Sequence, residues 1–171
     1  VGGCMMEGVT GEAASLAGHP KLSNLCWIYD NNKITIERHT NWEFSEDVAT
    51  RFIGYGWNVT RVGDANDLDM LEHAFQTFEN TTDGPSLIII DSHIAYGSPH
   101  KQDTHAAHTA PLGDDEIKLN RRNYGWPEDE KFLVSDEMYA HFQNGVGSRG
   151  QNLREAWIAN FADCRSTHPQ L

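Results

Sequence analysis

The sequence is poor in basic residues and contains no long apolar run. Its 171 residues include 13 lysines and arginines but 25 aspartates and glutamates, which gives a formal charge of −12 at pH 7. Nucleic acids and anionic membranes are bound by basic surfaces, so we expect neither as a partner. No stretch reaches the roughly 18 apolar residues of a membrane-spanning helix, so the sequence predicts no transmembrane segment.

Cysteine is also scarce. Cys4, Cys26 and Cys164 form no Cys-x-x-Cys motif, and their odd number leaves one thiol unpaired in any set of disulfides. Reduced thiols in a cytoplasmic protein are therefore the simpler interpretation.

The length and composition are those of one globular domain, since 39% of the residues are apolar and 22% are charged. The chain opens at Val1-Gly2-Gly3, which we interpret as the end of a strand. It has no starting methionine and no signal-peptide pattern. We therefore interpret the chain as a fragment of a longer polypeptide.

Apolar runs alternate with segments of helical period. The runs predict strands over 25–29, 57–62 and 86–91, and the last is the strongest because it is rich in isoleucine. Helical spacing and capping residues predict helices over 5–18, 45–55, 67–78, 114–124, 135–142 and 151–163. This alternation predicts an α/β fold with a parallel sheet and right-handed crossovers.

The segment 93–113 shows no clear period, and a loop of about twenty residues inside a domain is usually functional or disordered. It carries His93, His100, His105 and His108, whose spacing does not match a metal-ligand pattern, so solvated loop histidines are the simpler interpretation. The acidic run 114–116 that follows is predicted to be a solvent-exposed helix start.

The segments around Gly3 and Asn31, which 27 residues separate, carry the pattern that bears most directly on function. Gly3 precedes a predicted helix, where the backbone can approach a phosphate closely. Asn32 and the carbonyl of Ile34 follow a predicted strand and offer oxygen ligands of the kind that Mg²⁺ prefers. Ligands of open α/β sheets bind at the carboxyl ends of strands. On spacing alone, however, tight turns remain the simpler explanation.

Several segments, in the same order along the chain, resemble transketolase. They lie at 3–8, 11–18, 30–36, 51–57 and 97–113, and the most distinctive are Cys-Met-Met-Glu-Gly and His-x-Ala-Pro-Leu-Gly. The resemblance implies a three-layer thiamine diphosphate-binding fold with a mainly parallel sheet flanked by helices, present here in part. It also implies transfer of a two-carbon ketol unit between sugar phosphates in the pentose phosphate pathway.

The resemblance assigns roles to individual residues. It implies that His108 is catalytic, near the diphosphate and the donor sugar. The residues implied to bind thiamine diphosphate are Gly3, Asp30, Asn32, Ile36, Ile94 and His108.

For the metal, the resemblance implies that Mg²⁺, which Ca²⁺ or Mn²⁺ can replace, is held by the Asn32 side chain and the Ile34 backbone oxygen. Gly2 stands where the family has its metal-binding aspartate, which weakens the expected binding. Lys33 and Thr109 also depart from the family pattern, where a small residue and a glycine are typical.

The resemblance further implies a homodimer with Glu7 and Glu12 at its interface, or the missing remainder of the chain, as the partner. It makes residues 1–130 part of the diphosphate- and magnesium-binding domain, and 131–171 a C-terminal helical extension leading to a linker. The glutamate that activates the cofactor would lie outside this chain, so we expect no catalysis by these 171 residues alone.

Other interpretations stay open. Glu7 can simply favour a helix dipole. Gly2 favours a non-catalytic paralogue or dimerisation partner that keeps the fold without binding cofactor, whereas Asn32, Ile34 and His108 favour the enzyme. Deoxyxylulose-phosphate synthase and dehydrogenase decarboxylase components are further thiamine enzymes, but the segments 4–8 and 108–113 argue against them.

Overall fold

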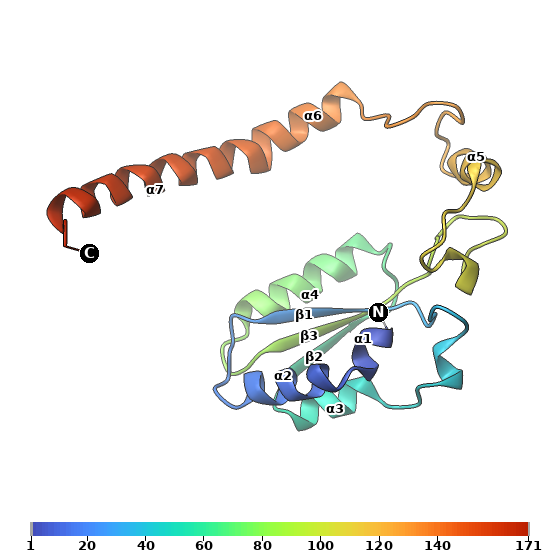
Figure 1. The fold of residues 1–171 in the computed structure, drawn as a ribbon, viewed down its shortest axis with the longest axis horizontal. Coiled ribbons are helices and arrows are strands. Elements are labelled where there is room, and N and C mark those ends of the chain that lie inside the picture. The colour runs from blue at the N-terminus through green and yellow to red at the C-terminus, as the bar shows by residue number, and fades with distance from the viewer. Residues whose placement is uncertain (1, 171) are drawn as a thin grey trace. The chain divides into compact units, whose positions relative to one another are not determined.

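A computed structural model describes residues 2–170, and the chain forms two compact units, residues 1–128 and 129–171. The first unit contains the sheet (Figure 1). Its elements in chain order are α1 (Gly2–Met6), α2 (Gly8–Gly18), β1 (Cys26–Asn31), η1 (Thr40–Trp42), α3 (Val48–Gly54), β2 (Asn58–Val62), α4 (Leu68–Asn80), β3 (Ser86–Asp91), η2 (His105–Ala107) and α5 (Asp114–Asn123).

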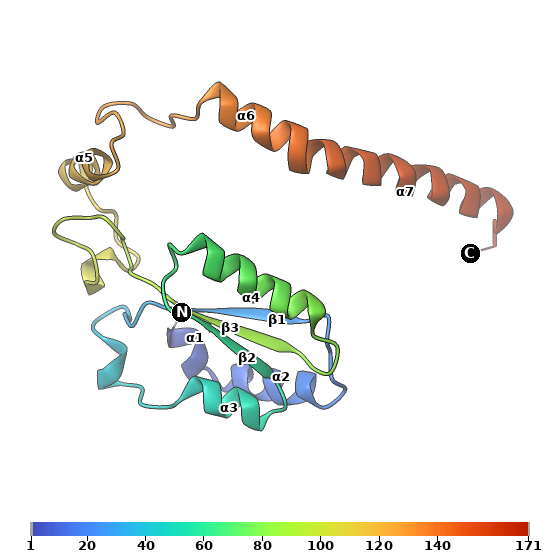
Figure 2. The ribbon, with the colours of Figure 1, turned by 180° about the vertical axis from the view of Figure 1, so that it is seen from behind.

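The three strands form a parallel sheet in the order β1-β3-β2. Alternate side chains of β3 point to opposite faces, as the strand period requires. Leu87 and Ile89 join the larger core cluster with α1, α2 and α3, while Ile88 joins the smaller cluster with α4. Figure 2 shows α4 on one face and α2 and α3 on the other. The predicted three-layer α/β arrangement is confirmed.

Aromatic residues join the helices to the sheet on the larger face. Phe52 is fully buried and lies edge-on to Trp27 and Trp57 at centroid distances of 5.9 and 5.2 Å. The Trp57 indole donates a hydrogen bond of 2.8 Å to the carbonyl of Ala14 in α2. The segment 51–57, singled out in the sequence, therefore builds the core beneath the sheet.

The N-terminal prediction was wrong in two respects. Gly2 begins the short helix α1 rather than ending a strand, and Val1 lies outside the described residues. The predicted helix 5–18 is also broken, because Glu7 has an extended backbone (φ −72°, ψ 133°) that separates α1 from α2. Arg51 stabilises the end of α1 by donating to the Met5 carbonyl at 2.9 Å.

Other boundaries shift by a few residues. The strand predicted at 25–29 continues to Asn31. The helix predicted from 45 starts at Val48, because the Asp47 side chain caps it by accepting from the Thr50 amide.

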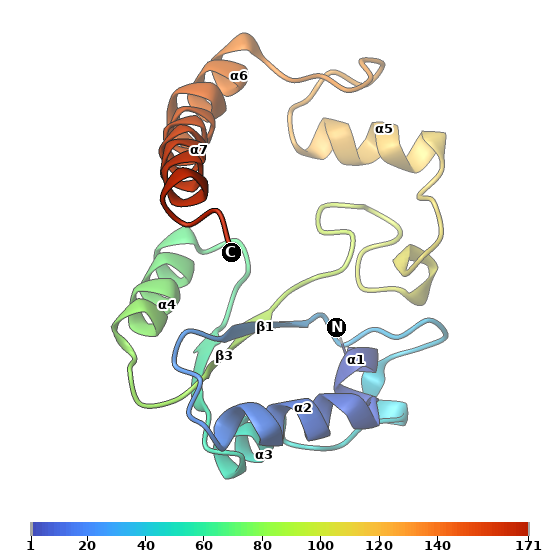
Figure 3. The ribbon, with the colours of Figure 1, turned by 60° about the vertical axis from the view of Figure 1, so that its left-hand side comes forward.

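The second unit is helical. Ser135 caps α6 (Asp136–Phe142), which continues through a π-helical turn, η3 (Gln143–Gly147), into α7 (Ser148–Thr167) (Figure 3). The last helix is longer than the predicted 151–163. No helix within residues 2–170 combines the length and the apolar character needed to cross a membrane.

Candidate functional site

The turn after β1 is fixed by Asn32. This side chain is 6% exposed, and its Oδ1 accepts a 3.0 Å hydrogen bond from the Ile34 amide while its Nδ2 donates to Asp30 at 3.1 Å. Lys33, between them, has φ of 62°. An asparagine that bonds the amide two residues later stabilises this kind of turn. The turn thus places Asn32 and Ile34 at the carboxyl end of β1.

Polar contacts tie the ends of the three strands together. The Asp91 carboxylate, at the end of β3, accepts from Asn31 at 2.6 Å and from two nitrogens of Arg61 in β2 at 2.9 and 3.0 Å. The Asp30 carboxylate accepts from the hydroxyl of Ser92. Asp30, predicted to bind cofactor, is therefore engaged in joining β1 to the segment after β3.

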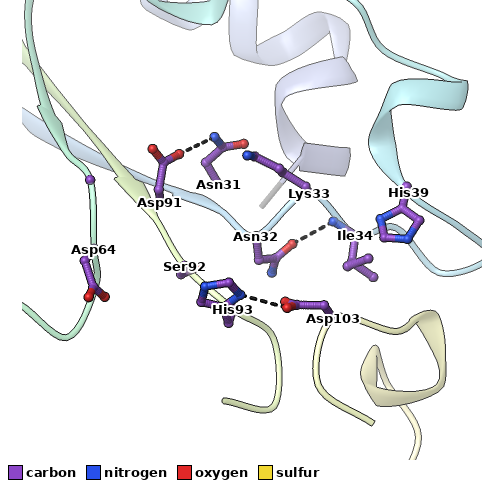
Figure 4. A pocket seen from close by; sticks show the side chains of 11 residues that line it. Asn31, Asn32, Lys33, Ile34, His39, Asp64, Asp91, Ser92, His93 and Asp103 are labelled. Atoms are coloured by element: carbon purple, nitrogen blue, oxygen red, sulfur yellow. Dashed lines mark hydrogen bonds and ion pairs between the residues drawn. The ribbon is translucent and has the colours of Figure 1, made fainter. Parts of the chain in front are cut away.

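A pocket of about 490 Å³ opens at these strand ends (Figure 4). The Asn32 turn lines one side and the outlet of β3 lines the other, where His93 Nδ1 lies 2.8 Å from an oxygen of Asp103. The complete lining is Asn31, Asn32, Lys33, Ile34, His39, Gly63, Asp64, Asp91, Ser92, His93 and Asp103.

The start of α1 lies against the loop that follows the Asn32 turn. A Cβ built on Gly2 would be 2.7 Å from Thr40 Cγ2 and 3.9 Å from the Tyr29 hydroxyl. Thr40 in turn donates its amide to the Lys33 carbonyl at 2.9 Å. The Tyr29 hydroxyl near Gly2 has a raised pKa, because it is buried and, to a smaller extent, because the Asp30 carboxylate is near. The structure therefore brings the glycine segment next to the asparagine turn.

A second pocket, of about 400 Å³, brings together three predicted cofactor-binding residues, Gly3, Ile36 and His108. A Cβ on Gly3 would meet no atom within 4 Å, so its backbone is open to the pocket. Ile36 is 63% exposed. His108 Nδ1 is buried, yet among the described residues it has no hydrogen-bond partner. Such an orphaned ring nitrogen is the kind of group that a bound ligand satisfies.

The remaining predicted residues lie at different places. Ile94 is half-buried and lines neither pocket, and its carbonyl accepts from the Asp103 amide at 3.1 Å. Glu7, between α1 and α2, lines the second pocket, and Glu12 is exposed on α2.

Lys33 and Thr109, which depart from the pattern that the resemblance implies, both have a left-handed backbone. Thr109 has φ of 95° and Lys33 has φ of 62°, a region that glycine or asparagine adopts at lower cost. A β-branched threonine directly after His108 therefore places strain in the loop that carries this histidine.

The acidic helix start at 114–116 was predicted in solvent, and this was wrong for Glu116. Asp114 and Asp115 are exposed, but Glu116 is only 8% exposed. Its carboxylate accepts from the Ser98 hydroxyl and, at 2.9 Å each, from the amide and Nδ1 of His100. These hydrogen bonds, the one from Ser98 first, lower the pKa of Glu116 to about 2. No sequence period in the 93–113 loop could have revealed the contact.

Acidic, histidine and cysteine side chains do not gather into a metal site in the described part of the chain. Among residues 2–170, no group of three or more histidines, cysteines, aspartates or glutamates converges to hold a metal ion. Asn32 Oδ1 already accepts one hydrogen bond, which leaves its second lone pair able to accept another bond. A divalent cation at this turn would therefore need further oxygen ligands besides Asn32.

Taken together, a parallel α/β sheet with pockets at the carboxyl ends of its strands is the arrangement of a domain that binds a phosphate-bearing cofactor. The whole chain, residues 1–171, matches the family described as "Transketolase, thiamine diphosphate binding domain". The chain belongs to the transketolase family.

Transketolases of other organisms are similar over nearly the full chain. That of Staphylococcus aureus strain MRSA252 is 41% identical over 169 residues, which cover 99% of this chain and 25% of that protein. That of a Nostoc species is 42% identical and matches 98% of this chain. The chain thus spans about a quarter of the length of these relatives.

Solved structures agree. A Pichia stipitis transketolase in complex with sedoheptulose 7-phosphate has a TM-score of 0.88 and 37% identity, over 98% of this chain and 25% of that one. The transketolase of Leishmania mexicana has a TM-score of 0.88 and 33% identity over the same shares. The expected thiamine diphosphate-binding fold is confirmed.

The environment of Glu116 predicts a pH-dependent contribution to stability. Its pKa is lowered from 4.5 to about 2, so the contribution is complete above about pH 4.5 and is lost as the pH falls towards 2. We expect Glu116→Gln to be less stable than the wild type at neutral pH, with a difference that shrinks across this window. Urea unfolding at a series of pH values measures it, with Asp115→Asn as control. A difference that does not change with pH would contradict the assignment.

Proposed function

We propose that this chain supplies the diphosphate-binding part of a transketolase that moves a two-carbon ketol unit between sugar phosphates, the reaction of the pentose phosphate pathway. The family match over the whole chain supports this, as do Pichia stipitis transketolase structures described with xylulose 5-phosphate, sedoheptulose 7-phosphate and fructose 6-phosphate. The observation that carries the proposal is His108, which lines the pocket of Gly3 and Ile36 and whose Nδ1 is buried without a hydrogen-bond partner among the described residues.

In this proposal the open backbone of Gly3 lies against the diphosphate and the exposed Ile36 side chain lies against the thiazolium. Asp30 holds the pocket wall through Ser92. Ile94, which the resemblance assigns to the cofactor, lines neither pocket and would reach the cofactor only if the loop after β3 moved. When bound, thiamine diphosphate supplies the nucleophilic carbon that ketol transfer needs. His108 binds a phosphate or sugar oxygen through Nδ1 and so acts by orientation rather than as a nucleophile.

The cation, Mg²⁺ with Ca²⁺ or Mn²⁺ as replacements, would be held by Asn32 Oδ1 and the Ile34 carbonyl. Gly2 supplies no carboxylate, so neither this position nor the two proposed ligands, the Asn32 amide and the Ile34 carbonyl, carries a negative charge. We expect cation binding to be weak unless phosphate oxygens complete the shell.

The rest of the active site would come from outside this chain, which corresponds to a quarter of its relatives. We propose a cytoplasmic homodimer, with the exposed Glu7 and Glu12 at its interface. The three free cysteines are consistent with a reducing compartment. Residues 1–130 would bind the diphosphate and cation, and 131–171 would lead to a linker, so these residues alone should be inactive.

A second candidate function is a non-catalytic partner that keeps the fold without the cation. One observation favours it: the space next to Gly2 is filled by Thr40 Cγ2, 2.7 Å from where a Cβ would stand. A carboxylate at this position needs Thr40 to move.

Removing the His108 ring should weaken cofactor binding. Hydrogen bonds to charged groups contribute about 1.5–3 kcal/mol, so His108→Ala in the full-length protein that contains this segment should raise the thiamine diphosphate Kd by roughly 10–100-fold. Calorimetric titration in the presence of Mg²⁺ measures this. His73→Ala, on the exposed surface of α4, is the matched control and should bind like the wild type. A wild type that binds no cofactor would favour the non-catalytic partner.

Restoring the carboxylate should strengthen metal binding only when space is made for it. We expect Gly2→Asp combined with Thr40→Ser, which removes the Cγ2 methyl, to bind Mg²⁺ at least about tenfold more tightly than the wild type in the presence of thiamine diphosphate. Gly2→Asp alone should gain less. Mg²⁺ titration by calorimetry distinguishes the variants, and equal affinities in all three proteins would refute a metal role for this position.

A further inference from the structure

The loop that carries His108 has little support from the core. Between His93 and Gly113, Ser98 is the one residue that is buried. Loops without buried apolar contacts take their conformation from hydrogen bonds, and they open at low free energy when those bonds are lost. The position of His108 therefore depends on the polar contacts that hold this loop.

Those contacts come mainly from α5 and the residue after it. Glu116 accepts from the Ser98 hydroxyl and from the amide and ring of His100. Asn123 donates to the Gly97 carbonyl at 2.8 Å, and the Tyr124 hydroxyl donates to the Tyr96 carbonyl at 2.6 Å. Residues of α5 and Tyr124 thus hold the start of the loop, and the Glu116 carboxylate accepts three of these hydrogen bonds.

The packing of Gly97 against α5 leaves no room for a side chain. A Cβ at this residue would lie 3.0 Å from atoms of Asn120 and Tyr124, and φ is 81°. The loop backbone therefore approaches α5 as closely as a glycine allows.

Short-range hydrogen bonds connect this anchored point to His108. The Gln102 amide donates to the Ser98 carbonyl, and Thr104 donates its amide and hydroxyl to the Lys101 carbonyl. The Ala107 amide then donates to the Thr104 carbonyl and the His108 amide to the His105 carbonyl, at 3.2 and 3.0 Å. Successive turns thus connect Ser98 and His100, which Glu116 holds, to His108, which lines the second pocket.

We propose that Glu116 is a positioning residue, which holds the 97–108 segment so that His108 Nδ1 faces the pocket of Gly3 and Ile36. Glu116 does not line either pocket and so acts only through the loop. The inference takes from the proposed function only that His108 contacts the cofactor or the sugar.

A general effect of negative charge at the helix start does not account for Glu116. Asp114 and Asp115 lie in the same first turn and are exposed, so they supply the favourable charge without holding the loop. Asp115→Asn is therefore a control that removes the same charge from the same turn.

Hydrogen–deuterium exchange of the full-length protein tests the anchor without reference to activity. In Glu116→Gln, the amides of Gln102, Thr104, Ala107 and His108 should exchange at least about tenfold faster than in the wild type. His100→Ala removes one exposed ring from the contact and should give a smaller increase in exchange rate. If Glu116→Gln does not fold, the exchange rates of His100→Ala test the anchor instead. Asp115→Asn should leave exchange unchanged. The proposal is wrong if Glu116→Gln and His100→Ala exchange like the control.

A double-mutant cycle then tests whether Glu116 acts through His108. Glu116→Gln should raise the thiamine diphosphate Kd about tenfold in the wild type but leave it unchanged in a His108→Ala background. Equal losses in both backgrounds would overturn the positioning role. If the wild type binds no cofactor, the proposed function fails, while the exchange measurement still decides whether Glu116 holds the loop.

Discussion

The carboxylate of Asp91 is the contact on which the rest of the site depends. It ends the central strand and accepts from Asn31 of β1 and Arg61 of β2, so it holds the carboxyl ends of all three strands together. Because parallel strands end at the same edge, this contact brings the turn after β1 next to the loop after β3. The pocket between them follows from that geometry.

The two sides of the site are built differently. The Asn32 turn is buried and is fixed by its own side chain, with Ile34 in the core. The His108 loop has almost no core contact and is held by hydrogen bonds to α5. The position of the first side is fixed by packing against the core, whereas the position of the second depends on its hydrogen bonds. The position of the His108 side chain is therefore sensitive to substitutions outside the pockets.

Much of the fold could be predicted from the sequence, because local patterns determine it. The isoleucine-rich run 86–91 is the central strand, and the alternation of strands and helices gave the parallel sheet. The break at Glu7 could not be predicted, since the helical spacing of apolar residues continues across it. The burial of Glu116 could not be predicted either, because it depends on the conformation of a loop without period. For the site, the resemblance to transketolase implied Gly3, Ile36 and His108, which the structure brings to one pocket, but also Ile94, which does not line that pocket.

We propose that the joined strand ends and the anchored loop form one half of a cofactor site, in which His108 Nδ1 binds an atom of the ligand. A crystal structure of the full-length protein grown with thiamine diphosphate and Mg²⁺ tests it most directly. We expect a polar atom of the cofactor within about 3.2 Å of His108 Nδ1, and the diphosphate against Gly3. A cofactor bound with His108 Nδ1 still facing only protein atoms would contradict it.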